Sequence, residues 1–315
     1  MGSYYFGFDG GQSSSTAVIA DDNGHLLGEG HGGPCNHVAA SEGREKFFSA
    51  VGGCLAAAAQ QAELDPTNLT FAAACFGFSG GAADKDAYAR ELVHADRYKI
   101  THDAEIALAG ATAGKPGIIV ISGTGSMAFG RNLAGQTARA GGWGYIFGDE
   151  GGSFDLTRRA VQAALRYEEK WGPQTQLRDR LLATTKAKDM NTLLHRFYTP
   201  EFTRSQIAAF APLVTEAAEA GDEAALEIIV AAALDLACFA EGVHRRLFER
   251  DRKVPVAHVG GGFKSAPLRE AFVAAIRERI GCIAVLPLLP PVMGAVLEAM
   301  RLDGNVTKVS FGMEA

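Results

Sequence analysis

The stretch FGFDGGQSSSTAVIADDNG, residues 6–24, decides the fold. Residues 4–8 and 14–20 have the apolar composition of strands, and DDNG at 21–24 is a strong hairpin signal that leads to a third strand near 26–30. We therefore expect the chain to open with an antiparallel meander of three strands. The turn between its first two strands carries an aspartate, two glycines and three serines. This turn is either a solvated hairpin end or a binding loop.

The chain after this meander alternates between helices and strands. The spacing of apolar side chains predicts helices at 42–62, 84–95 and 104–113, and strands at 70–77 and 97–101. Together with the opening meander, these elements form one α/β lobe.

A second copy of the pattern begins at residue 117. GIIVIS at 117–122, the turn GTGS and the run MAFGR repeat the opening hairpin, and a third strand is expected near 136–140. Residues 152–250 have the apolar spacing of helices almost throughout. The second lobe then resumes with elements expected at 254–262 (strand), 266–279 (helix), 282–286 (strand) and 291–301 (helix).

The repeat predicts an α/β protein of two duplicated lobes that face a central cleft. We expect an N-terminal lobe at 1–115 and a C-terminal lobe at 116–315, with a helical insertion at 152–250 and a last helix, 291–303, that packs back on the first lobe. Open α/β sheets bind ligands at the carboxyl ends of their strands. Glycine or acidic signals stand at four such ends: Asp9–Gly11, Asp103, Gly123–Gly125 and Gly260–Gly262.

The composition limits the class of function. The chain has 315 residues, 47% of them hydrophobic, and a net charge of -6 without a run of Lys or Arg, which argues against a nucleic-acid or anionic-membrane partner. Its five cysteines form no C-x-x-C pair, so we expect neither a disulfide framework nor a zinc site. No signal peptide or membrane span is evident. We therefore expect a cytoplasmic protein.

Two glycine motifs resemble nucleotide-binding fingerprints and are set aside. GTGSMA at 123–128 matches the dinucleotide motif G-x-G-x-x-A, but that motif must open a helix, and only a short apolar run separates it from the next turn. GATAGK at 110–115 has three residues between its glycines instead of four, and Pro116 follows where a P-loop has Ser or Thr.

The polar turns supply what phosphoryl transfer requires, namely donors around the phosphates, a divalent cation and a base. In the first turn, Gly10 and Gly11 allow a tight bend, and backbone N–H groups with the side chains of Gln12, Ser13 and Ser14 form an anion-binding nest. Asp9 then holds Mg²⁺, directly or through water.

The second turn offers a matching nest. It consists of Gly123, Thr124, Gly125 and Ser126, and the Thr124 hydroxyl can reach a phosphate. The glycines Gly260, Gly261 and Gly262 follow a buried strand and would let a flat ring lie against the backbone. Many strand–helix junctions share this last pattern, so it is a weak signal alone.

Asp103 stands between a strand and the helix AEIALAGA. It is either the N-cap of that helix or a general base that accepts a proton from a substrate hydroxyl.

Five motifs in order resemble one known family. DGGQSSSTAVIADDNG, HDAEIAL, SGTGSMAFG, GGWGYIFGDEG and VGGGF are similar to those of the N-acetylglucosamine and glucosamine kinases of the BadF/BadG/BcrA/BcrD ATPase family, within the actin, Hsp70 and sugar-kinase superfamily. The resemblance covers nearly the whole chain and implies two ribonuclease-H-like (actin-like ATPase) lobes. It assigns the first motif to phosphate and magnesium, the third to phosphate, VGGGF to adenosine, and Asp103 to the base that deprotonates the sugar 6-hydroxyl.

The resemblance also implies which residues hold the sugar. They are Asn36, Ser79, Gly80, Trp143 and Asp149. Asn and Asp side chains suit sugar hydroxyls, and an indole offers an apolar platform, although Trp143 could instead be a core aromatic. A free ammonium on the sugar would require a nearby carboxylate, which Asp149 could provide. We expect N-acetylglucosamine as acceptor, with glucosamine and N-acetylmuramic acid as alternatives, and ATP as donor.

An alternative of another class remains open. The same family contains ATPase activators of 2-hydroxyacyl-CoA dehydratases, which hold an iron–sulfur cluster between two subunits with cysteine thiolates. None of the five cysteines stands in a motif of that kind. A sugar-sensing transcription regulator would carry a DNA-binding segment before the first strand, which here begins by Tyr4. The resemblance further makes a homodimer an expectation.

Overall fold

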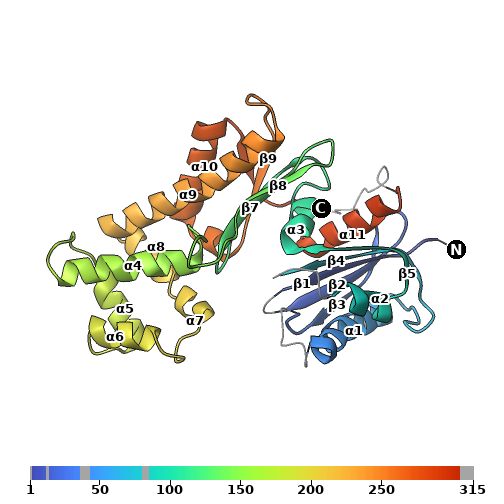
Figure 1. Cartoon of the computed structure of the whole chain (residues 1–315), viewed down its shortest axis with the longest axis horizontal. Coiled ribbons are helices and arrows are strands. Elements are labelled where there is room, and N and C mark those ends of the chain that lie inside the picture. Colours follow the sequence, from blue (N-terminus) through green and yellow to red (C-terminus); the bar gives the residue numbers. More distant parts are fainter. Residues whose placement is uncertain (1, 12–13, 36–42, 80–84, 306–315) are drawn as a thin grey trace. The chain divides into compact units, whose positions relative to one another are not determined.

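Figure 1 shows the computed structural model of the chain, which describes residues 2–11, 14–35, 43–79 and 85–305. It divides into two compact units. The first comprises residues 1–115 together with 287–315, and the second comprises residues 116–286.

The sheet of the first unit has the strand order β3-β2-β1-β4-β5. Strands β1 and β2 and strands β2 and β3 pair antiparallel, whereas β4 lies parallel to both β1 and β5. The carboxyl ends of β1, β4 and β5 therefore meet at one edge of the sheet. The strands are β1 (Tyr5–Gly10), β2 (Ser15–Ala20), β3 (Leu26–Gly32), β4 (Phe71–Phe78) and β5 (Ala95–His102).

Helices cover both faces of this sheet, as Figure 1 shows. Alternate side chains of β1 point to opposite faces, so Phe6 and Phe8 join the core under α1, whereas Tyr5 joins the core under α3 and α11. The helices are α1 (Gly43–Gln61), α2 (Asp86–Leu92), α3 (Asp103–Ala111) and α11 (Pro291–Leu302).

Helix α11 returns to the first unit from the far end of the chain. It packs on α3, β1 and β4. Gly294 makes a close approach possible, because a methyl group there would overlap the carbonyl oxygen of Ile106 and the backbone of Gly110. Tyr5 donates a hydrogen bond to Asp303 just beyond the helix at 2.8 Å. The first unit is thus completed by residues that follow the second unit in sequence.

The second unit repeats this topology around a sheet of order β10-β9-β6-β7-β8. Again two antiparallel pairings precede two parallel ones. The strands are β6 (Gly117–Ser122), β7 (Ser126–Arg131), β8 (Thr137–Gly141), β9 (Pro255–Val259) and β10 (Ile283–Val285). The α/β class and the repeated lobe predicted from the sequence are confirmed.

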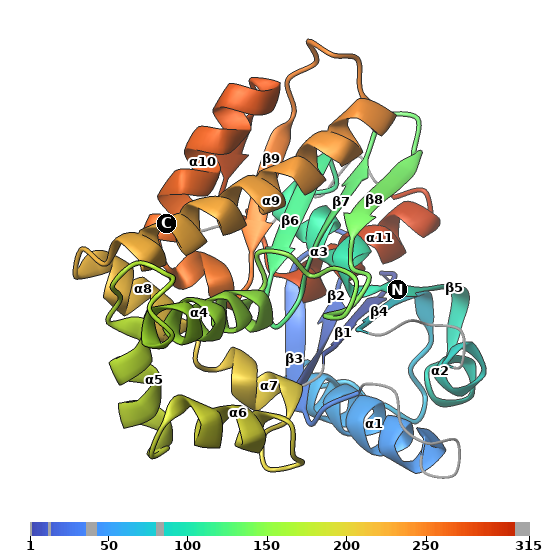
Figure 2. The same ribbon diagram turned by 60° about the vertical axis from the view of Figure 1, so that its left-hand side comes forward.

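Between β8 and β9 the chain forms helices only. They are α4 (Ser153–Glu168), α5 (Leu177–Thr185), α6 (Met190–Phe197), α7 (Arg204–Ala208), α8 (Pro212–Glu219) and α9 (Glu223–Leu247). After β9 follow a 3₁₀ turn, η1 (Gly261–Lys264), and α10 (Ala266–Ile280). Helix α9 packs across β7 and β8 and against α10 (Figure 2). Within the described residues, no helix is long and apolar enough to cross a membrane.

Candidate active site

The carboxyl edge of the first sheet brings two aspartates together. Asp9 is the penultimate residue of β1, and Asp103 follows directly after β5 as the first residue of α3. In the parallel register, Asp9 is opposite Gly77 and Gly77 is opposite Thr101, so both carboxylates belong to the same edge. The sequence therefore located both acids correctly at strand ends.

The electrostatics of Asp9 are unusual for an aspartate. Burial, and then the negative charge of Asp103, raise the pKa of Asp9 to about 6. Neither acid has a lysine or arginine ion-pair partner among the residues that the structure describes. Two neighbouring carboxylates without a cationic partner favour a cation or a proton at this edge.

Asp103 is half-buried and held in place by hydrogen bonds. One carboxylate oxygen accepts from the Ala104 amide at 2.8 Å, and the Ser79 hydroxyl also hydrogen-bonds the carboxylate. Burial raises the pKa of Asp103, and these hydrogen bonds with nearby His102 oppose the rise. His102, not Asp103, occupies the N-cap position of α3, so the N-cap alternative for Asp103 is wrong by one residue.

In the turn between β1 and β2, some backbone groups already form hydrogen bonds within the protein. The Gly11 amide donates to the Ser14 carbonyl at 3.0 Å, and the Gly10 carbonyl accepts from the Ser79 amide at 3.0 Å. The Gly11 N–H is therefore already engaged within the turn. The expected ligands Gln12, Ser13, Asn36 and Gly80 lie outside the described residues.

The second turn is also closed by a hydrogen bond between two of its own backbone groups. The Gly123 amide donates to the Gly125 carbonyl at 2.8 Å, and the turn is docked on the N-terminus of α4 through bonds from Ser153 to Gly123 and from Phe154 to Thr124. The hydroxyl of Thr124 has no hydrogen-bond partner within the described chain. It is available to a ligand. Ser126 begins strand β7 and not a helix, so the dinucleotide fingerprint is excluded.

The glycines after β9 pack against this second turn. A Cβ at Gly262 would overlap the Ser122 hydroxyl, and Ser122 in turn donates to the Gly151 carbonyl at 2.7 Å. Three motifs that are far apart in sequence, SGTGS, GDEGG and VGGG, therefore form one cluster in the second unit. Ser265 is the N-cap of α10, and its side chain accepts a hydrogen bond from the Leu268 amide.

A cavity of about 370 Å³ opens beside Gly261 and Gly262. It has the apolar side chains and backbone of the α7–α8 region on one side and the η1 turn on the other. Its lining residues are Ser153, Leu156, Ala208, Ala209, Ala211, Pro212, Thr215, Glu216, Gly261, Gly262, Lys264 and Ser265. The walls from the helical insertion carry no motif, so sequence reasoning missed them.

Asp149 is buried and forms an ion pair with Arg204 of α7. Its other oxygen lies 3.4 Å from the Ser126 amide. The Arg204 guanidinium also stacks over the rings of Tyr145 and Phe154, at 5.1 and 5.9 Å from their centroids. The sequence did not reveal that Arg204 contacts Asp149, because no motif surrounds Arg204.

Trp143 is not a core residue. Its side chain is 66% exposed, and the Arg139 guanidinium lies 4.7 Å from its ring centroid. The structure thus excludes the core-aromatic alternative. Nearby, a groove of about 730 Å³ runs between the 145–146 turn, α4, α6 and α7, with Arg204 and Arg158 on its walls.

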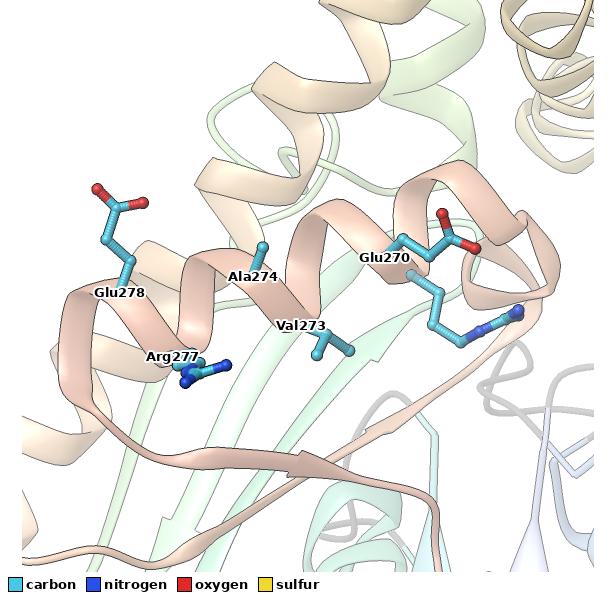
Figure 3. Close-up of a pocket in the computed structure, with 6 residues that line it drawn as sticks. Glu270, Val273, Ala274, Arg277 and Glu278 are labelled. Carbon is cyan, nitrogen blue, oxygen red and sulfur yellow. The ribbon is translucent and has the colours of Figure 1, made fainter.

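A third hollow lies along α10 (Figure 3). Its walls come from one helix, with Glu270 and Glu278 pointing away from Arg277 and Val273. Because all of the described residues that line it belong to this one helix, we assign it no ligand.

Comparisons with known proteins agree with these motifs. The model of the BadF/BadG/BcrA/BcrD ATPase family matches residues 6–299. A Clostridium acetobutylicum relative named N-acetylmuramic acid/N-acetylglucosamine kinase is 33% identical over 82% of this chain and 85% of its own. A Dictyostelium discoideum relative named N-acetyl-D-glucosamine kinase is 29% identical over 94% and 98% of the two chains. A solved Chromobacterium violaceum structure, provisionally named an N-acetylglucosamine kinase, has 29% identity and a TM-score of 0.73, covering 94% and 98%.

Proposed function

Because the chain belongs to the BadF/BadG/BcrA/BcrD ATPase family, we propose that it is an ATP-dependent kinase that phosphorylates the 6-hydroxyl of N-acetylglucosamine. The observation that carries the proposal is the pair of half-buried carboxylates, Asp9 and Asp103, at one strand edge without a basic partner among the described residues. Asp9 would bind the cation, and Asp103 would accept the proton of the attacking hydroxyl. Relatives from two organisms are named for the same sugar.

Asp103 acts as the general base in this proposal. It accepts the proton of the sugar hydroxyl while the new O–P bond forms to the γ-phosphorus and the bond to the β-phosphate oxygen breaks, which releases ADP. Burial raises its pKa and so makes the carboxylate a stronger base, while its hydrogen bonds to Ala104 and Ser79 fix its orientation. The proton then passes to solvent.

Asp9 is the residue that would hold Mg²⁺. Its carboxylate is an oxygen ligand of the kind that Mg²⁺ prefers, and its raised pKa reflects a charge that lacks a partner. Bound Mg²⁺ would neutralise developing charge on the phosphates. In the second unit, the free Thr124 hydroxyl is available to the phosphates of the nucleotide.

The cavity beside Gly261 and Gly262 suits the adenosine of ATP. Its volume of about 370 Å³ and its wall of Leu156 and small residues fit a planar, largely apolar base. A Cβ built at Gly261 would have no atom within 4 Å, so the backbone at this glycine leaves room for the base.

The Asp149–Arg204 pair favours an N-acetylated sugar over free glucosamine. A lone carboxylate would attract the ammonium of glucosamine, but Arg204 already compensates the charge of Asp149. A neutral acetamide does not compete with that pair. The exposed indole of Trp143 offers a platform for a sugar face.

The test is a coupled-ADP assay of wild type and Asp103→Asn over N-acetylglucosamine, N-acetylmuramic acid, glucosamine and glucose. We expect the highest kcat/KM for N-acetylglucosamine, and a fall in kcat of roughly 10²–10⁴ in the variant, which is the usual contribution of a general base. Asp96→Asn, an exposed aspartate of the same strand β5, is the matched control and should retain activity. Turnover near the wild-type value in Asp103→Asn would overturn the role of the base.

The dehydratase-activator alternative receives no support from the cysteines. Cys35, Cys54, Cys75 and Cys282 are buried, and only Cys238 is exposed. Burial raises the pKa of Cys54 to about 11, which disfavours the thiolate that a cluster requires. No group of three His, Cys, Asp or Glu residues in the described parts of the chain could hold a metal ion.

A further inference from the structure

A network of ion pairs lies beside the corner between β5 and α3. The Lys99 ammonium of β5 donates to Glu105 of α3 at 2.7 Å and to Glu298 of α11 at 2.5 Å. Arg301, three residues further along α11, lies 3.6 Å from Glu298. The Glu298 side chain is 1% exposed and that of Glu105 is 15% exposed. Figure 1 shows α3 and α11 packed side by side in the first unit. The chemistry proposed above uses none of these charges.

Lys99 and Glu105 are both ionised in this network. Burial alone would lower the pKa of Lys99, but the carboxylates of Glu298 and Glu105 raise it above its usual value. Burial alone would raise the pKa of Glu105, but hydrogen bonds from Lys99 and Thr101 lower it below its usual value. Replacing a buried ion pair by apolar residues is often neutral or stabilising, so stability alone does not explain the network. Holding one defined geometry is another use of buried ion pairs.

Glu105 joins the strand before Asp103 to the helix that Asp103 begins. Lys99 and Thr101 precede Asp103 on β5, and Glu105 is the third residue of α3. The buried Thr101 hydroxyl donates to one carboxylate oxygen of Glu105 at 2.5 Å, and Lys99 donates to the other oxygen at 2.7 Å. These contacts form a side-chain bridge across the β5–α3 corner. In the sequence, Asp103 stands midway between Thr101 and Glu105.

The direction of the Asp103 carboxylate depends on the backbone of this corner. The carboxylate accepts a hydrogen bond at 2.8 Å from the amide of Ala104, the residue between Asp103 and Glu105. A shift of the backbone at 103–105 would therefore move the carboxylate together with one of the groups that hold it. A general base must lie within hydrogen-bond reach of the proton that it accepts, and a displacement of roughly 1 Å can cost about a hundredfold in rate.

We propose that Glu105 and Thr101 are positioning residues that hold Asp103 in the orientation in which it accepts the proton of the sugar hydroxyl. Lys99 fixes the second oxygen of Glu105, and Glu298 fixes Lys99 to α11. The inference rests on the proposed function, because it requires Asp103 as the base. Glu105 and Thr101 act through Asp103 and not on the substrate.

The first test removes one hydroxyl group from the bridge. Thr101→Val keeps the branched side chain that suits a strand, so the fold should be preserved. We expect kcat with N-acetylglucosamine to fall roughly tenfold and KM for sugar and ATP to change less than about threefold, because the base acts in the chemical step. Thr101→Ser restores a hydroxyl and should recover most of the lost kcat. A wild-type kcat in Thr101→Val, or no recovery in Thr101→Ser, would overturn the role of Thr101.

The second test asks whether Glu105 acts through Asp103. Glu105→Ala should lower kcat roughly 10- to 100-fold when Asp103 is present. In the Asp103→Asn background the same change should lower kcat by less than about threefold, because the base that Glu105 orients is already lost. A residue that only supports the fold would lower kcat by the same factor in both backgrounds. Equal factors would therefore overturn the proposal.

Glu298→Gln is the matched control for the stability of the network. It removes the charge of the other carboxylate that Lys99 contacts, but Thr101 and Lys99 still hold Glu105. It should lower the midpoint of urea unfolding and leave kcat within about threefold of wild type. If kcat in Glu298→Gln and Glu105→Ala falls in proportion to the loss of stability, the network is structural only and the inference is wrong.

The outcomes distinguish this inference from the proposed function. A wild-type protein that phosphorylates no amino sugar, or an Asp103→Asn variant with wild-type turnover, would overturn both. A large loss of activity in Asp103→Asn together with full activity in Glu105→Ala would overturn the inference alone and leave the proposed function intact.

Discussion

At the scale of single residues, the candidate site contains a buried carboxylate, Asp9, whose negative charge is unfavourable until a cation binds. The pKa of Asp9 rises from 3.8 to about 6 in the folded protein, so without a cation the ionised carboxylate destabilises the native state at neutral pH. Active-site residues often carry such costs because function, and not stability, selects them.

Asp9→Asn should stabilise the metal-free protein at pH 7. Between pH 3.8 and about 6, Asp9 is more often protonated in the folded state than in the unfolded state. Asp9 therefore does not lower the free energy of unfolding below pH 3.8. It lowers that free energy progressively as the pH rises through 6. Because Asp9 retains some solvent contact, we expect a gain of about 1–2 kcal/mol at pH 7 and little below pH 4. Urea unfolding in the presence of EDTA at pH 7 and below pH 4 measures the change in the free energy of unfolding. An equal change at the two pH values would contradict the prediction. Kinase activity should fall in the same variant.

Arg204→Gln should shift the acceptor preference toward glucosamine. Removing the guanidinium leaves the carboxylate of Asp149 without its counter-charge, and the ammonium of glucosamine can then supply it. We expect the ratio of kcat/KM for glucosamine over N-acetylglucosamine to rise roughly tenfold. Arg158→Gln is the matched control, because Arg158 lines the same groove and its partner Asp155 keeps Arg159 at 2.8 Å. An unchanged ratio would remove Asp149 from the amino-group pocket.

At the scale of elements, the α3–α11 contact is set by glycine. Gly294→Ala should destabilise the protein by about 1–3 kcal/mol, because a methyl group meets the backbone of α3 and cannot be accommodated by a rotamer change. Gly53→Ala is the control: no atom lies within 4 Å of a Cβ built at that exposed position of α1, so the change should stabilise slightly. Urea unfolding measures the change in the free energy of unfolding for both variants. A change of the same sign in both would disprove the close-approach argument.

The sequence predicted elements better than the partners of distant side chains. Both opening hairpins were predicted because apolar runs end at glycine and aspartate turns, and the structure has strands at Tyr5–Gly10 and Gly117–Ser122. Asp9 and Asp103 were placed because strand ends are visible in the sequence. The pair of Asp149 with Arg204 was not predicted, since the partners are 55 residues apart and only the packing of the helical insertion joins them.

At the scale of the whole molecule, the first unit is built from two separate parts of the chain, and the second unit lies between them in the sequence. A protein that ends at Leu286 should keep a folded second unit but lose the first, because α11 supplies much of the core on one face of β1 and β4. Circular dichroism in urea should show two transitions in the wild type and one in the truncated protein. The fluorescence of Trp143 and Trp171, which both lie in the second unit, should keep its transition, and proteolysis within residues 2–115 should become faster. A truncated protein in which the first unit resists protease as well as wild type would contradict this.

The late position of α11 has a consequence for synthesis on the ribosome. The five strands of the first sheet leave the ribosome early, yet the helix that covers one of their faces is translated after all of residues 116–286. At about 5–20 residues per second, that delay lasts on the order of ten to thirty seconds. During this interval Tyr5, Val18 and Ala73 lack the cover of α11, so the nascent first unit is a natural client for a chaperone, whereas the second unit can finish folding before the chain is released.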